Sequence, residues 1–168
     1  MTDFAYTLYD TAEFDDAADV EHTLFQVGQG ADATHNKGFT NARGGGSMPG
    51  EERFEVKSID VWLDADAIAA DRENMWLASY LEFEVSDKTV LIAPLSQFAK
   101  NNSFGGFVGQ AAAADEALIG RTGNGYHLEI PIILEGGNSF RVVVFQGTAL
   151  ATDPTNVKVA LNGVLSRP

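Results

Sequence analysis

The sequence predicts an all-β domain, built as an antiparallel sandwich or a closed barrel of seven or eight strands. Its 168 residues are enough to enclose one hydrophobic core. Short segments rich in β-branched and aromatic residues recur along the chain, and turn residues or long loops separate them. Strands and helices do not alternate in the way that predicts a parallel sheet, so an antiparallel fold is favoured.

The expected strands share apolar residues that alternate with polar ones or run together between turn signals. They lie at residues 22–27, 54–63, 81–85, 89–93, 126–134, 139–146 and 157–165. The alternation breaks at residues 58–59, which predicts a bulge. Residues 86–88 separate two strands at the spacing of a hairpin. Pro131 cannot donate to a strand ladder, so it predicts an edge strand or a bulge.

One helix is expected over about residues 66–78. An acidic N-cap-like residue precedes a run of good helix formers, and Ile68, Met75 and Trp76 would share one helix face. The sequence therefore predicts a single short helix beside the strands.

Two long connections complete the expected fold. Residues 28–50 contain glycine and proline throughout and predict an irregular loop. Loops of this length inside a domain are usually functional or interfacial. Residues 94–122 predict a second long connection, with a short helix at the alanines of 111–114.

The negative charge is concentrated at the N-terminus. The formal net charge is −13, and residues 1–22 hold seven acidic residues but no Lys or Arg. Such a block is typical of a solvated tail. Aromatic residues lie between the acids, however, and purely solvating tails contain few of them. We expect an acidic N-terminal arm over 1–22 that docks on a neighbouring subunit, followed by one domain over 23–168.

Composition excludes several classes of protein. The absence of cysteine excludes disulfides and cysteine-based zinc sites. A sequence pI near 4.4 argues against direct nucleic-acid binding, because such surfaces carry clustered Lys and Arg. No segment approaches the roughly 18–20 apolar residues of a membrane-spanning helix.

The sequence contains no recognisable catalytic or metal-binding set. His127 and Glu129 would face one side of a strand, but a third metal ligand is missing. Glu82 and Glu84 could imitate a glycosidase pair, although alternating carboxylates are typical of the solvated face of a strand. The Gly-x-Ser-x-Gly motif is absent. We expect no enzyme activity, no cofactor and no bound metal ion.

Large aromatic side chains allow a different hypothesis. Trp62, Trp76 and Tyr80 could form a sugar-binding platform, as in a carbohydrate-binding β-sandwich module or a receptor-binding head. Aromatic residues near strands and helices belong to the core more often than to such platforms.

Two groups of short motifs carry a family resemblance. The first is Thr40-Asn41, a glycine-rich spacer, Met48-Pro49 and the start of the strand at 54–63. The second comprises segments 128–132, 139–143 and 157–167, the last ending in a Leu-x-Gly-x-x-x-Arg pattern. Together they resemble the jelly-roll capsid proteins of tailless icosahedral bacterial and archaeal viruses, many of which enclose an internal membrane.

The resemblance implies a single eight-stranded antiparallel jelly-roll sandwich with one short helix and long loops. It implies a structural protein of the virion, either a major capsid, a penton or a decoration protein. The expected partners are other copies of the chain, other capsid proteins, and an internal viral membrane or its proteins. A cupin-like enzyme is disfavoured because the His-x-His ligand set is missing. The candidate subunit-interface residues are Phe4, Tyr6, Tyr9, Phe14, Phe39, Asn41, Met48, Phe104 and Phe107.

Overall fold

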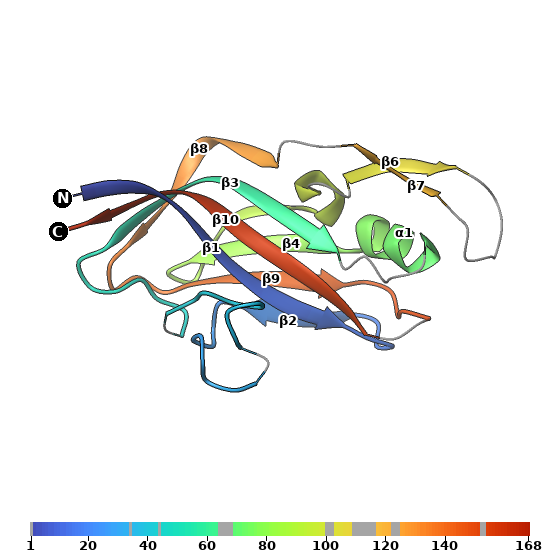
Figure 1. Cartoon of the computed structure of the whole chain (residues 1–168), viewed down its shortest axis with the longest axis horizontal. Coiled ribbons are helices and arrows are strands. Elements are labelled where there is room, and N and C mark those ends of the chain that lie inside the picture. The colour runs from blue at the N-terminus through green and yellow to red at the C-terminus, as the bar shows by residue number, and fades with distance from the viewer. Residues whose placement is uncertain are drawn as a thin grey trace.

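Two four-stranded antiparallel sheets pack face to face as a β-sandwich (Figure 1). The computed structural model describes residues 2–33, 35–43, 45–63, 69–99, 103–108, 117–121, 125–151 and 154–168, with the backbone alone for 103–108 and 117–121. The expected all-β class and the antiparallel sandwich are confirmed.

The two sheets draw their strands from the whole length of the chain. The first sheet has the order β1 (Thr2–Phe14), β10 (Thr155–Arg167), β3 (Arg53–Leu63) and β8 (Tyr126–Glu135). The second has the order β2 (Val20–Leu24), β9 (Phe140–Gln146), β4 (Tyr80–Val85) and β5 (Lys88–Pro94). Four antiparallel pairs are nested in the sequence: β4 with β5 innermost, then β3 with β8, β2 with β9, and β1 with β10 outermost.

The remaining elements lie near one end of the sandwich. Helix α1 spans Ala69–Ala78, a 3₁₀ turn η1 spans Leu95–Phe98, and β6 (Ser103–Val108) pairs with β7 (Ala117–Arg121). Residues 94–122 were expected to form a long connection with no strands. This prediction is wrong, because the segment contains η1 and the β6–β7 hairpin. The expected helix at 111–114 and the start of the helix at 66–68 lie outside the described residues.

The core fills the space between the two sheets. Its largest fully buried side chains are Trp76, Phe14, Phe25, Phe54, Phe83 and Phe98. Met75 and Trp76 are both buried on the same side of α1, as their spacing predicts.

The predicted hairpin turn, bulge and edge strand are confirmed, and each prediction depends on only a few neighbouring residues. Ser86 and Asp87 form the β4–β5 turn with positive φ angles of 49° and 60°, the backbone that a two-residue hairpin requires. The bulge in β3 lies at Lys57, which the register with β10 skips between Val56 opposite Gly163 and Ser58 opposite Asn162. Val56 and Ile59 are three positions apart and would face opposite sides of a regular strand. The extra residue lets both side chains face the core. Pro131 lies in β8, an edge strand, as expected.

The N-terminal segment is part of the sandwich, whereas an arm separate from the domain was expected. β1 pairs with β10 over its full length, from Thr2 opposite Arg167 to Phe14 opposite Thr155. Leu8, Ala12 and Phe14 are buried in the core. Asp10, a buried acid between Leu8 and Ala12, interrupts this apolar alternation in the sequence. Docking of the segment on a neighbouring subunit stays a prediction.

Candidate functional site

A shallow groove lies on the outer face of the first sheet. It has a volume of about 560 Å³ and is lined by Thr11, Gly38, Phe39, Trp62, Leu63, Asn156 and Lys158. Thr11 of β1 and Trp62 of β3 lie on either side of Lys158 of β10 in the strand register. We call this feature the Trp62 groove. Its volume lies within the range of protein binding sites.

The loop of residues 36–42 forms one wall of the groove by folding against the open edge of β1. Asn41 acts like a short piece of strand: its side chain accepts from the backbone N–H of Tyr9 at 2.7 Å and donates to the carbonyl of Thr7 at 2.7 Å. Its own N–H donates to the carbonyl of Tyr9 at 3.1 Å. These bonds occupy backbone groups that an exposed edge strand would offer to another chain.

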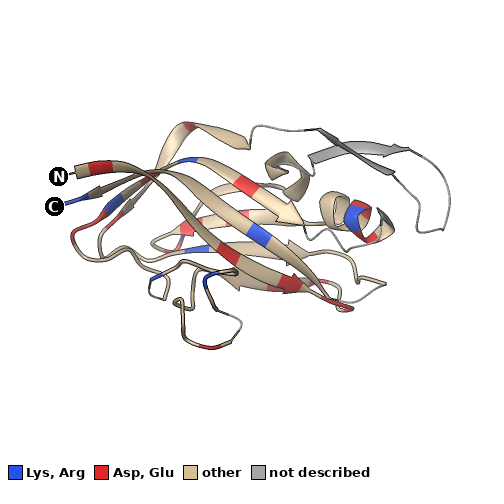
Figure 2. Cartoon of the chain, in the orientation of Figure 1, with Lys and Arg blue, Asp and Glu red and all other residues tan. Residues whose placement is uncertain are grey.

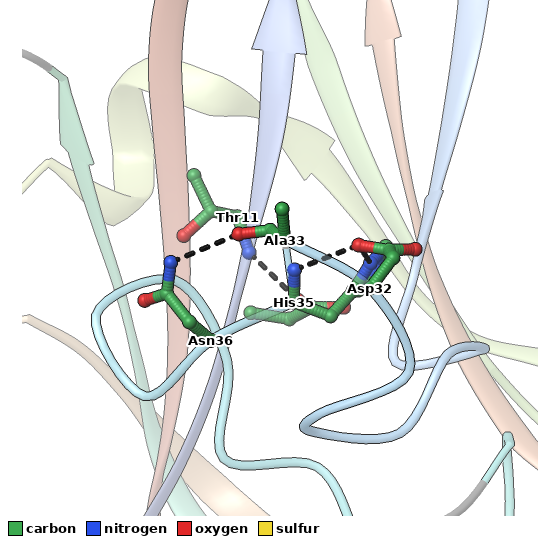
Figure 3. A network of polar contacts seen from close by, with 6 residues as sticks. Thr11, Asp32, Ala33, His35 and Asn36 are labelled. Atoms are coloured by element: carbon green, nitrogen blue, oxygen red, sulfur yellow. Dashed lines mark hydrogen bonds and ion pairs between the residues drawn. The ribbon is translucent and has the colours of Figure 1, made fainter.

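Further hydrogen bonds hold the wall in place. The hydroxyl of Thr11 donates to the carbonyl of Phe39 at 2.7 Å. Figure 3 shows the preceding turn beside Thr11, where Nδ1 of His35 lies 2.6 Å from Oδ1 of Asp32 and Nδ2 of Asn36 donates to the carbonyl of Ala33. The groove is therefore a preformed feature of the folded loop.

Lys158 supplies the charge of the groove. Its ammonium group donates to the carbonyl of Gly38 at 2.6 Å and lies 5.5 Å from the centre of the Tyr9 ring. Among the described residues that line the groove, Lys158 is the only charged one. Lys158 lies opposite Thr11 of β1, whose neighbour Asp10 is acidic, and Figure 2 shows basic positions on β10 and acidic ones on β1. The groove combines an apolar floor with one positive charge in an acidic protein.

A buried carboxylate connects β1 to the start of the loop that follows β2. Asp10 accepts from the N–H of Phe25 at 2.5 Å and from the N–H of Thr11 at 2.9 Å. Phe25 is fully buried with a positive φ of 66°, a conformation that a bulky residue adopts only when its surroundings hold it. Burial raises the pKa of Asp10 above its usual value, although its hydrogen bonds act in the opposite direction. Asp10 is thus a structural group that holds two distant segments together.

Four of the candidate interface residues pack against other parts of the same subunit. Phe4 and Tyr6 form edge-to-face contacts with each other and, through Tyr6, with the ring of Phe54. Phe14 stacks on His22, and Met48 is buried. Phe14 and Met48 are therefore not free to contact another copy, whereas Phe4 and Tyr6 are only half-buried.

Other candidates have different positions. Tyr9 and Asn41 fasten the 36–42 loop to β1, and Phe39 is 36% exposed at the groove. Phe104 and Phe107 lie in β6, where their backbones pair with β7 residues, and their side chains lie outside the described part of the chain. Of these residues, Phe39 is the one that the structure brings into a surface feature.

The predicted aromatic platform does not form. Trp76 is fully buried, Tyr80 stacks on Phe145 in the second sheet, and Trp62 lies in the groove on the first sheet. Trp76 lies on α1, Tyr80 on β4 of the second sheet and Trp62 on β3 of the first sheet, so the three rings do not form one platform.

The polar pairs considered in the sequence have ordinary partners or surroundings. Arg141 donates to Glu84 at 2.6 and 3.2 Å, and the hydroxyl of Thr89 donates to Glu82. His127 and Glu129 are exposed on β8. Over the described ranges, no three His, Cys, Asp or Glu side chains cluster as metal ligands would.

No sequence pattern marks the groove, nor does one mark Ile130, the most exposed large apolar residue among the side chains that the structure describes. The groove depends on a loop folding onto a strand some thirty residues away, a contact that periodicity does not encode. Ile130 alternates in the sequence like a core residue but is 83% exposed. Pro131 beside it was the available signal of an irregular strand.

Comparisons of the chain with protein-family models, with curated proteins and with solved structures find no match. In the part of the chain that the structure describes, no helix has the length and apolar character needed to cross a membrane.

Proposed function

We propose that the sandwich is a single jelly roll and that the chain is a structural protein of a virus particle, a capsid subunit. The observation that carries the proposal is the nesting of four antiparallel strand pairs, from β4–β5 to β1–β10, across two four-stranded sheets. A jelly roll has this organisation, and viral capsid domains are among the proteins built on it. Lectin domains and cupins share the fold, so the strand order alone does not identify function.

The residues of the capsid-like motifs support the proposal through their contacts. In the C-terminal pattern, Gly163 lies where a Cβ would overlap the carbonyl oxygen of Glu55 on the adjacent strand. Arg167 pairs with Glu52 at 2.6 Å and lies 5.1 Å from the centre of the Phe4 ring. Both motif residues therefore have physical reasons for their identity within this sandwich.

The N-terminal motif also has a structural role. Thr40 and Asn41 bind the edge of β1, and Met48 is buried in the core. The loop of residues 36–42, which includes Thr40 and Asn41, forms one wall of the groove. The motif thus positions a surface that another protein can contact, which is what a capsid subunit requires.

The proposed location is the virion, where the partners are other copies of the chain and other capsid proteins, with an internal viral membrane or its proteins as a further partner. Light scattering coupled to size-exclusion chromatography tests the central claim. We expect oligomers of defined size, and electron microscopy of that fraction should show rings or shells. A protein that stays monomeric at millimolar concentration would overturn the proposal.

A carbohydrate-binding module is the second candidate, and the Trp62 groove favours it. Trp62 and Phe39 offer apolar ring surface, while Asn156 and Lys158 offer polar groups beside it. A glycan array followed by calorimetry tests this function. Micromolar binding to a monomer, lost in Trp62→Ala but retained in Tyr80→Ala, would favour it over the capsid function.

A further inference from the structure

A knob projects from the edge of the first sheet opposite to β1. In the pairing of β8 with β3, Ile132 lies opposite Val56 and His127 lies opposite Ser58. Between these two pairs, β3 has one residue, Lys57, and β8 has residues 128–131. The longer segment of β8 therefore bulges away from the ladder.

The bulge turns an apolar side chain into solvent. Leu128 packs against the core at one side of the bulge, whereas Ile130 is 83% exposed. Glu129 beside it is also exposed, and Pro131 restricts the backbone that follows. We call residues 129–131 the Ile130 knob. It presents an apolar group and a negative charge on a backbone with little conformational freedom.

The Trp62 groove has the complementary properties. It presents apolar surface from Phe39, Trp62 and Leu63 together with the positive charge of Lys158. Knob and groove lie toward opposite edges of one sheet, because β8 is the last strand and the groove spans β1, β10 and β3. One copy therefore presents the knob on one side and the groove on the other.

We propose that the Ile130 knob of one copy inserts into the Trp62 groove of the next copy, with Glu129 beside Lys158. This inference rests on the proposed function in one respect, namely that copies of the chain assemble. A contact between two different patches is heterologous, and it generates a ring when the rotation between copies closes.

Local charge complementarity is the electrostatic observation that supports a second copy as the partner. Each chain carries a net charge of −13, so two copies repel each other unless oppositely charged groups meet locally. Lys158 of one copy and Glu129 of the next provide such a pair, and opposite charges at an interface fix its register. The apolar groups around them supply the attraction that the charges alone do not.

Two variants and one matched control test the proposal. Ile130→Ser removes the knob, and Phe39→Glu places a negative charge in the groove opposite Glu129. Ile92→Ser is the control, because Ile92 is also exposed, at 61%, but lies on β5 of the second sheet. Circular dichroism and thermal unfolding of each variant establish that the monomer is folded.

Light scattering over a concentration series gives the readout. We expect Ile130→Ser and Phe39→Glu each to raise the dissociation constant of assembly about 10- to 100-fold, and Ile92→Ser to leave it unchanged. An equimolar mixture of the two disrupted variants should form a heterodimer and nothing larger, because each pair of chains retains one intact knob and one intact groove.

The alternative outcomes separate this inference from the proposed function. If the native chain assembles and Ile130→Ser assembles equally well, the knob is not the contact while the capsid function stands. If Ile92→Ser alone abolishes assembly, the interface lies on the second sheet and the inference is again wrong. A native chain that is always monomeric, or that binds a glycan in the groove as a monomer, overturns both.

Discussion

Phe14→Ala tests whether the acidic N-terminal segment belongs to the sandwich. Phe14 ends β1, is 0% exposed, and stacks on His22 with ring centres 4.8 Å apart. Replacing a buried phenylalanine by alanine removes its apolar contacts and leaves a cavity that the neighbours fill only in part.

The expected loss is about 3–5 kcal/mol in the free energy of unfolding. Domains of this kind are stabilised by only about 5–15 kcal/mol, so the loss is a large fraction of the total. With a urea dependence of about 2 kcal/mol per molar, the midpoint of unfolding should fall by about 2 M. Urea unfolding followed by tryptophan fluorescence measures this shift.

Glu13→Ala is the matched control. Glu13 neighbours Phe14 on the same strand but is exposed, so its replacement should change the free energy of unfolding by less than about 0.5 kcal/mol. Both variants are measured at the same protein concentration, since assembly makes apparent stability depend on concentration. Equal midpoints for the two variants would refute the placement of β1 in the core and restore the separate arm.

Three further predictions follow from polar contacts and close packing. Asp10→Asn should lower the free energy of unfolding by about 1–3 kcal/mol in urea titrations, because the amide NH₂ would face a backbone N–H. Burial raises the pKa of Asp10, so the folded state binds the Asp10 proton more tightly than the unfolded chain does. The stability that this group contributes is therefore greatest below pH 3.8 and falls as the pH rises through the folded pKa. Asp10→Asn should remove this pH dependence of the free energy of unfolding, and its absence in the native chain would contradict the assignment. Gly163→Ala should destabilise by about 1–3 kcal/mol while Gly50→Ala, which has open space, should not; equal thermal midpoints would contradict the close approach. Asn41→Ala should speed hydrogen exchange at the amide of Tyr9 by about tenfold without unfolding the sandwich, and unchanged exchange would show that the loop is held by other contacts.

The parts of the fold that the sequence predicted are those encoded within a few residues. The β4–β5 hairpin follows from a polar turn between two apolar segments, and the bulge at Lys57 follows from a break in alternation. Strand β1 could not be predicted so directly, because Asp10 interrupts the row of apolar residues that face inward. Its partner lies at the far end of the chain, and strand pairing over that separation leaves no local pattern.

The candidate site was predictable only in part, because it also depends on contacts between residues far apart in sequence. Phe39 and Asn41 were expected at a subunit interface, and the structure places both in the loop that builds the groove. The contribution of Lys158 depends on its register between β1 and β3, which the sequence of β10 does not specify. Ile130 has the spacing of a buried residue, and only the bulge of β8 exposes it.

The outermost strand pair has a consequence for how the protein is made. Thr2 lies opposite Arg167, and the two ends of the described chain lie together in Figure 1. During synthesis β1 emerges well before β10, its hydrogen-bonding partner, because β2 to β9 lie between them in the sequence. Until then one edge of β1 and its apolar side chains remain uncovered, and such surfaces promote aggregation. Many contacts join residues far apart in sequence, so folding is expected to be slow.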